Sequence, residues 1–171
     1  AYINEFLQAV PHQAVSFTGG EPLLHTGLLR ELLPLIGCKR FLETNGTLPD
    51  KLAEVLPWID IISMDIKLPQ ATGREMWPEH ERFLRLAVEA EKDVYAKLVV
   101  PGDLVEADFD RAVEVIASVE PSVLLILQPV TPMNGVPGAE PGYMLELQQR
   151  ALAKLPDVRV IPQTHRMMNQ L

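Results

Sequence analysis

Apolar runs alternate with helical patterns along the whole chain. Six short, mostly apolar runs predict strands over residues 14–18, 39–44, 59–67, 93–100, 122–130 and 157–165. Between them, apolar residues at spacings of three and four predict helices over about 27–36, 50–57, 78–92, 106–118 and 142–155. Apolar strands separated by helices are typical of a parallel sheet that is covered on both faces. We therefore expect an α/β fold, either an open doubly wound sheet or a (β/α) barrel.

Composition and charge narrow the class of protein. The chain has 171 residues, 47% of them hydrophobic and 22% charged, and shows no linker or repeat, so residues 1–171 are expected to form one domain. The net charge of −8 argues against a nucleic-acid partner, which needs a basic face. No apolar run approaches the roughly 20 residues that span a bilayer. No secretion signal is recognisable at the start, so we expect a cytoplasmic protein without a membrane partner.

The chain contains one cysteine, Cys38. A disulfide within the chain, a four-cysteine zinc site and a cysteine-ligated iron–sulfur cluster are therefore excluded for these residues. We interpret Cys38 as a small buried residue at the entry to a strand.

Polar residues follow the apolar body of every predicted strand. In both parallel architectures, ligands bind at the carboxyl ends of the strands. The polar and glycine residues at these ends are Thr18, Gly19, Gly20, Glu21, Glu43, Thr44, Asn45, Gly46, Asp65, Lys67, Lys97, Gln128, Gln163 and His165. Because all six strands end in this way, we expect these residues to share one cleft.

The first two strand ends combine carboxylates with glycines. Gly19 and Gly20 allow the backbone to approach a ligand where a β-carbon would clash, and Glu21 can accept hydrogen bonds from an ammonium group. Together they suit an amino-acid headgroup, although a plain strand–helix turn with a surface glutamate has the same sequence. Glu43 can accept from hydroxyls or an ammonium, whereas the Asn45-Gly46 pair is equally well explained as a turn.

The next two strand ends carry opposite charges. Asp65 and Lys67 are two residues apart and so face the same side of a strand. Such a pair can bind ribose hydroxyls, a carboxylate or a cation, or can simply form a salt bridge. Lys97 lies inside an apolar strand, where an unpaired ammonium is costly, so it must have a partner. That partner is either a protein carboxylate or an anionic group of a ligand.

The last two strand ends provide amides and a histidine. Gln128 can offer its amide to a nucleobase. Gln163 and His165 are again two residues apart, and His165 is interpreted as functional: an acid–base group or a ligand donor. The other histidines, His12, His25 and His80, are interpreted as structural.

The motifs TGGEP (18–22), ETNG (43–46) and MDIK (64–67) occur in an order and spacing that resemble the radical S-adenosylmethionine (radical SAM) superfamily. The resemblance covers essentially the whole chain. Within the superfamily, FTGGEPLL, LETNGTLP, LILQPVTP and above all VIPQTHR resemble the 7-carboxy-7-deazaguanine synthase family of queuosine and 7-deazapurine synthesis. ETNG and MDIK are also similar to segments of the glycyl-radical-enzyme activases, which are the alternative.

The resemblance implies a ligand for each part of the cleft. Gly19, Gly20 and Glu21 would hold the methionyl amino group of SAM. Glu43, Asp65 and Lys67 would surround its methionyl and ribose parts, and Gln128 would flank its adenine. Gln163 and His165 would reach the substrate, 6-carboxy-5,6,7,8-tetrahydropterin. The family uses a [4Fe–4S] cluster to cleave SAM into a radical that abstracts a substrate hydrogen, and it also needs Mg²⁺.

The sequence departs from the superfamily at the cluster. The family's three-cysteine motif precedes its GGEP strand, and these residues contain no such motif. We therefore expect a partial (β/α)₆ barrel that lacks its first β/α unit: the C-terminal part of a longer enzyme, inactive by itself. The alternative is a cluster-less, non-catalytic module that binds a nucleoside or a partner. An open sheet edge also predicts self-association, for example as a homodimer.

Overall fold

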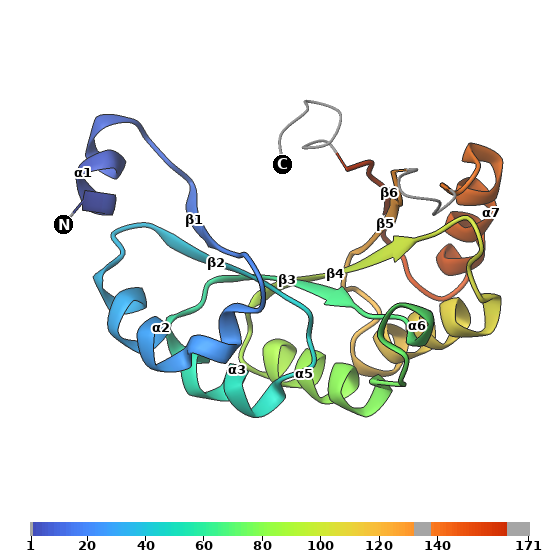
Figure 1. The fold of residues 1–171 in the computed structure, drawn as a ribbon, viewed down its shortest axis with the longest axis horizontal. Helices are drawn as coiled ribbons and strands as arrows, with labels where there is room; N and C mark the ends of the chain where they lie inside the picture. Colours follow the sequence, from blue (N-terminus) through green and yellow to red (C-terminus); the bar gives the residue numbers. More distant parts are fainter. Residues whose placement is uncertain (1, 132–137, 164–171) are drawn as a thin grey trace.

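The computed structural model describes residues 2–131 and 138–163. Six strands form one parallel sheet in the order of the chain (Figure 1). They are β1 (Ala14–Phe17), β2 (Lys39–Thr44), β3 (Ile61–Ile66), β4 (Asp93–Val100), β5 (Leu125–Pro129) and β6 (Val158–Val160). All six predicted strands are confirmed. Strands β2 and β4 match their predicted bounds, and the other four are shorter than predicted.

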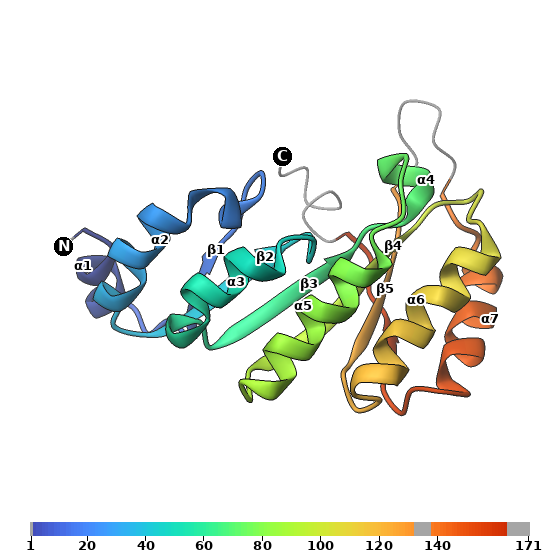
Figure 2. The ribbon, with the colours of Figure 1, turned by 90° about the horizontal axis from the view of Figure 1, so that it is seen from below.

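The winding of the sheet favours a barrel-like arrangement over the doubly wound one. Each strand pairs with the next strand of the chain, so the sheet grows in one direction without reversal. Since crossovers between parallel strands are right-handed, helices of such a sheet gather on one face. Figures 1 and 2 show α2, α3, α5, α6 and α7 along the convex face of a curved sheet. In the described part of the chain, β1 pairs only with β2 and β6 only with β5, so the sheet is open.

The five predicted helices are confirmed, and the structure adds α1 and α4, which were not predicted. The α-helices are α1 (Tyr2–Ala9), α2 (Thr26–Leu32), α3 (Pro49–Val55), α4 (Pro69–Thr72), α5 (Trp77–Glu89), α6 (Glu106–Val119) and α7 (Pro141–Leu152). The 3₁₀ turns are η1 (Pro22–His25), η2 (Leu33–Leu35) and η3 (Leu56–Trp58). Proline stands in the first turn of α3, α4, α5 and α7, where its missing N–H costs nothing. None of the helices in the described ranges is long and apolar enough to cross a membrane.

The hydrophobic core lies between the sheet and the helices of its convex face. Along β3, Met64 and Ile66 are buried against these helices, whereas Asp65 between them is only partly buried. The expectation of a sheet covered on both faces is therefore wrong, because the described helices cover one face only. The concave face instead carries half-buried aromatic and charged side chains, such as Phe41 and Tyr95, whose rings are 6.2 Å apart. In the described part of the chain, this face carries the polar side chains of the strand ends.

Candidate functional site

A polar hollow of about 220 Å³ lies at the carboxyl ends of the first four strands. Its lining residues are Thr18, Gly20, Glu43, Thr44, Asn45, Ser63, Asp65, Lys67 and Lys97. The parallel arrangement of β1 to β4 brings these four strand ends together, as the sequence predicts. The structure therefore places most of the predicted polar residues of these four strands around one cavity.

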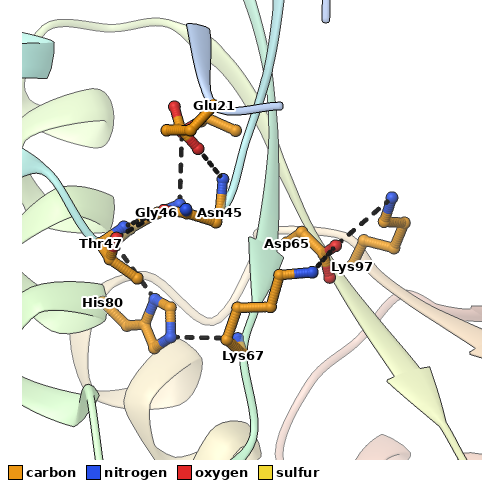
Figure 3. Close-up of polar contacts among 9 residues, drawn as sticks. Glu21, Asn45, Gly46, Thr47, Asp65, Lys67, His80 and Lys97 are labelled. Carbon is orange, nitrogen blue, oxygen red and sulfur yellow. Dashed lines mark hydrogen bonds and ion pairs between the residues drawn. The ribbon is translucent and has the colours of Figure 1, made fainter. Parts of the chain in front are cut away.

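Glu21 does not line the hollow itself but accepts hydrogen bonds from two residues that do, Thr44 and Asn45. Its Oε1 accepts hydrogen bonds from the Leu23 amide at 3.1 Å and the Thr44 hydroxyl at 2.8 Å. Its Oε2 accepts one from the Asn45 amide at 2.8 Å. Glu21 thereby caps η1 and also fastens the end of β1 to the end of β2 (Figure 3). A carboxylate has about four acceptor positions, so the three bonds leave capacity for one more donor.

The glycines before Glu21 are required by their backbone conformation. Gly19 and Gly20 have φ angles of 90° and 57°, which side chains with a β-carbon rarely adopt. A β-carbon built on either would meet nothing within 4 Å. The turn thus selects glycine through backbone geometry, and it leaves open space beside the backbone at the rim of the hollow.

The turn after β2 forms the second wall. The Asn45 side chain accepts from the Thr47 amide at 3.0 Å and the Thr47 hydroxyl at 2.6 Å. The Asn45-Gly46 pair is therefore a turn, yet Asn45 also lines the hollow, so both interpretations apply. Glu43 accepts from the Ser16 hydroxyl at 3.0 Å, which links the two walls near the base of the turn.

Asp65 stands between two lysines. The Lys67 ammonium lies 2.7 Å from Asp65 Oδ2, and the Lys97 ammonium lies 3.8 Å from the same oxygen. Lys97 is aligned with Asp65 in the register of β3 and β4. The protein partner of Lys97 is thus the Asp65 carboxylate, which lies closer to the Lys67 ammonium than to that of Lys97. The other oxygen, Asp65 Oδ1, is buried and has no hydrogen-bond partner among the described residues.

Two carboxylates and two ammonium groups give the hollow a balanced charge. Glu43 and Asp65 offer acceptors, and Lys67 and Lys97 offer donors. This set of donors and acceptors fits the zwitterionic headgroup of an amino acid, and Asp65 Oδ1 is an acceptor without a partner among the described residues. The residues present therefore fit SAM.

A second, larger hollow of about 390 Å³ adjoins the first and shares Asp65 and Lys67 with it. Its walls are mainly apolar and include Leu68, Val99 and Val130. No sequence motif indicated this hollow. An apolar cavity beside a polar one suits a ligand with a flat ring system joined to a charged headgroup.

His80 does not line the hollow and is structural, as the sequence suggested, but its contacts with the site motifs were not predicted. It is fully buried on α5, where its Nε2 accepts from the Lys67 amide at 3.1 Å and its Nδ1 lies 3.2 Å from the Gly46 carbonyl oxygen. Burial lowers the pKa of His80 below its usual value. One neutral imidazole thus contacts the backbone of two site motifs.

The remaining predicted residues lie apart from the polar hollow. Gln128 is half-buried on β5 and is not among the lining residues. The Gln163 side chain accepts from the Thr131 amide at 3.2 Å and so joins the exits of β5 and β6. His165 lies outside the described residues.

These residues cannot ligate a [4Fe–4S] cluster through three cysteines, because the sequence contains only one. Cys38 directly precedes β2, at the opposite end of the strand from the hollow, and it is partly exposed rather than buried as expected. In residues 2–131 and 138–163, no group of three or more His, Cys, Asp or Glu side chains could hold a metal ion.

Known proteins resemble the chain in sequence and in fold, although no family model matches it. The 7-carboxy-7-deazaguanine synthase of Geobacter sulfurreducens is 42% identical over 163 residues, which cover 94% of this chain and 64% of that protein. The synthase of Methanopyrus kandleri is 34% identical over 161 residues, covering 91% of this chain and 60% of that protein. The chain thus spans less than two thirds of the length of these relatives.

A solved structure shares the fold. The crystal structure of a radical SAM methyltransferase from Sphaerobacter thermophilus superposes with a TM-score of 0.68 at 14% identity, over 94% of this chain and 54% of that one. The chain therefore shares the fold of that radical SAM methyltransferase. Its sequence is similar to those of 7-carboxy-7-deazaguanine synthases, which confirms the resemblance indicated by its strand-end motifs.

Proposed function

We propose that the polar hollow binds the methionyl end of SAM and that the chain is part of a 7-carboxy-7-deazaguanine synthase. The observation that carries the proposal is the hollow itself: two carboxylates, two ammonium groups and an unpaired buried oxygen at the ends of parallel strands. The sequence relationship to the Geobacter sulfurreducens synthase supports the same assignment.

Each part of the hollow has a role in this proposal. Lys67 and Lys97 attract the ligand's carboxylate, while Glu43 and Asp65 accept from its ammonium or ribose hydroxyls. Gly19 and Gly20 let the backbone approach the headgroup, and Glu21 uses its remaining acceptor position for the ammonium. The larger apolar hollow takes the nucleoside part, near the β5 end that carries Gln128.

The proposed substrate is 6-carboxy-5,6,7,8-tetrahydropterin, with Gln163 and His165 as the residues proposed to contact it. SAM and its [4Fe–4S] cluster supply the radical chemistry when bound, and Mg²⁺ is a further expected cofactor. The cysteines of the cluster are not among these 171 residues. The proposal therefore treats the open sheet as a (β/α)₆ barrel without its first unit, with cluster binding and turnover as properties of a longer protein.

Calorimetric titration with S-adenosylhomocysteine, a stable SAM analogue, tests the binding proposal. We expect wild type to bind it, and Asp65→Asn to bind it about tenfold more weakly because the buried acceptor loses its charge. Asp50→Asn is the matched control, since Asp50 is exposed on α3 and does not line the hollow. Absence of wild-type binding, or equal weakening in both variants, would overturn the proposal.

A non-catalytic nucleoside-binding module is the second candidate, and the apolar hollow is the observation that favours it. Adenosine separates the two candidates in the same calorimeter. If adenosine binds as tightly as S-adenosylhomocysteine, the methionyl contacts contribute nothing and the module is correct. In the intact enzyme, SAM cleavage without pterin turnover would keep the radical SAM assignment and reject the synthase.

A further inference from the structure

His80 occupies an unusual place for a buried histidine. It lies on α5, beneath the sheet, yet both of its ring nitrogens contact backbone atoms of the two motifs that form the hollow (Figure 3). One contact is to Gly46 in the ETNG turn after β2, and the other is to Lys67 at the end of MDIK. The two contacts join segments that are 34 and 13 residues away from His80 in sequence.

The hydrogen bonds determine the tautomer of the ring. A backbone amide can only donate, so Nε2 must carry a lone pair to accept from the Lys67 amide. A carbonyl oxygen can only accept, so Nδ1 must carry the proton and donate to Gly46. Both bonds exist together only in the neutral Nδ1–H form. The fully buried position favours this neutral form because a charge would be desolvated.

We infer that His80 is a positioning residue: as a neutral Nδ1–H imidazole, it sets the spacing between the Asn45-Gly46 wall and the Asp65-Lys67 wall of the ligand hollow. The inference deepens the proposed function and rests on it for the identity of the ligand. Lys67 directly follows β3. Its amide donates to His80, which fixes the backbone at this point, while its side chain turns back to Asp65.

The packing around the ring supports this role. A β-carbon on Gly46 would lie 3.1 Å from His80 Nδ1 and 2.7 Å from Met64 Cγ, so turn, ring and strand are in close contact. The Trp77 ring, one turn earlier on α5, lies 6.4 Å from the imidazole ring. A displacement of the imidazole would therefore shift both walls of the hollow together.

Protonation of His80 at low pH should break its hydrogen bond with the Lys67 amide. The charged groups that act on the ring are Asp65 on β3 and Glu79 on α5, which both favour protonation, but burial outweighs them. Once protonated, Nε2 would present an N–H to the Lys67 N–H, and that hydrogen bond would be lost. Because burial lowers the pKa of His80 below its usual value of 6.5, affinity for the ligand should persist just below that pH and fall only as the pH drops through the lowered pKa.

Nitrogen-15 NMR of the wild-type chain tests the tautomer without ligand. We expect the neutral Nδ1–H form at pH 7 and slow hydrogen exchange at the Lys67 amide, relative to its intrinsic rate. A protonated ring, or the Nε2–H form, would overturn the inference. This measurement is independent of SAM binding, so it decides the role of His80 even if wild type fails to bind S-adenosylhomocysteine and the proposed function falls.

Three variants then separate positioning from general folding. His80→Asn keeps a donor near Gly46 but loses the acceptor for Lys67, whereas His80→Gln places an acceptor near Lys67. We expect the Asn variant to expose the Lys67 amide and to weaken S-adenosylhomocysteine binding about five- to tenfold, as for one lost hydrogen bond, and the Gln variant to recover part of both. His25→Asn, at an exposed histidine, is the control.

The pH profile completes the test. Wild-type affinity should fall as the pH drops through the lowered pKa of His80, below 6.5, and the affinity of His80→Gln should stay flat in that range because glutamine does not titrate. An unchanged Lys67 amide in His80→Asn, or identical pH profiles in wild type and His80→Gln, would show that the histidine does not align the site.

Discussion

Asp65 and Lys97 lie side by side on β3 and β4, yet their charged atoms stay 3.8 Å apart because Lys67 occupies the shared oxygen at 2.7 Å. Lys97 therefore keeps most of its capacity to donate hydrogen bonds. An ammonium that is mainly buried and only loosely paired is expensive for folding alone. Lys97 lines the hollow, where its ammonium could donate to the anionic group of a bound ligand.

Replacing Lys97 with methionine should separate binding from stability. We expect Lys97→Met to weaken S-adenosylhomocysteine binding about five- to tenfold, since one charge-assisted contact is lost. The free energy of unfolding should change by less than about 1 kcal/mol, because the 3.8 Å ion pair contributes little. Lys154→Met is the control: its exposed ion pair with Glu114 lies outside the hollow, so binding should be unaffected. Equal loss of affinity in both variants would contradict the assignment.

Glu21 should matter for folding as well as for the ligand. In Glu21→Gln, one carboxylate oxygen becomes an NH₂ group that cannot accept from the Thr44 hydroxyl or the Asn45 amide, depending on its orientation. We expect a loss of about 1–3 kcal/mol in the free energy of unfolding, measured by urea denaturation, because a partly buried donor is left unpaired. Glu31→Gln on the exposed side of α2 should be neutral. A neutral Glu21→Gln would show that the three bonds are not important for stability.

The fold was largely predictable because its strands are short apolar runs bounded by prolines, glycines and charges. Strand order was not, since the doubly wound sheet and the barrel share this pattern and differ only in the direction of each crossover. Helices α1 and α4 were both missed, and α4 could not be seen because a single turn, Pro69–Thr72, is too short to show a helical period. Helix α4 ends at Gly73, which has a φ of 73°, and this glycine was the sequence signal available for a helix end.

The site was predicted where polar residues end a strand and missed where they do not. Ser63 lies within the apolar run IISMDI, two residues before Asp65, and strand alternation places it on the same face of β3 as Asp65. The contacts of His80 with the site motifs were missed because its two partners are distant in sequence. The usable signal was its helical spacing with Phe83, Leu84 and Ala87, which places a polar residue on the buried face of α5.

The open edge of the sheet predicts self-association. β1 has no partner on its outer side among the described residues, and Ile3 and Val10 nearby are 41% and 56% exposed. We expect light scattering to show dimers or larger species, and Ile3→Lys with Val10→Lys to shift them toward monomer. Leu145→Lys, at an exposed leucine on α7, is the control and should leave the assembly unchanged. A wild-type monomer at all concentrations would contradict the prediction.

The ion pair at the start of β2 predicts acid sensitivity. Asp60 accepts from the Arg40 side chain at 2.7 and 2.9 Å and from its amide at 2.8 Å, and the hydrogen bond with the Arg40 side chain holds the Asp60 pKa below its usual 3.8. Since the folded pKa is the lower one, this stabilisation is complete above pH 3.8 and is lost as the pH falls through the folded value. Asp60→Asn should flatten the dependence of stability on pH below about 4. Asp50→Asn, in an exposed pair with Arg82, should leave that dependence nearly unchanged.

Gly46 offers the sharpest test of how tightly the site is packed. In Gly46→Ala, the new β-carbon would lie 2.7 Å from Met64 Cγ and would adopt a φ of 65°, so both contact and backbone strain oppose it. We expect thermal and urea unfolding to show a loss of about 2–4 kcal/mol, because overpacking and left-handed strain add. Gly73→Ala isolates the strain, since its φ is 73° but nothing lies within 4 Å, and should cost only about 1 kcal/mol. Equal losses in the two variants would mean that the side chains of Met64 and His80 can move to accommodate the new β-carbon, and that the ETNG turn is not tightly packed against them.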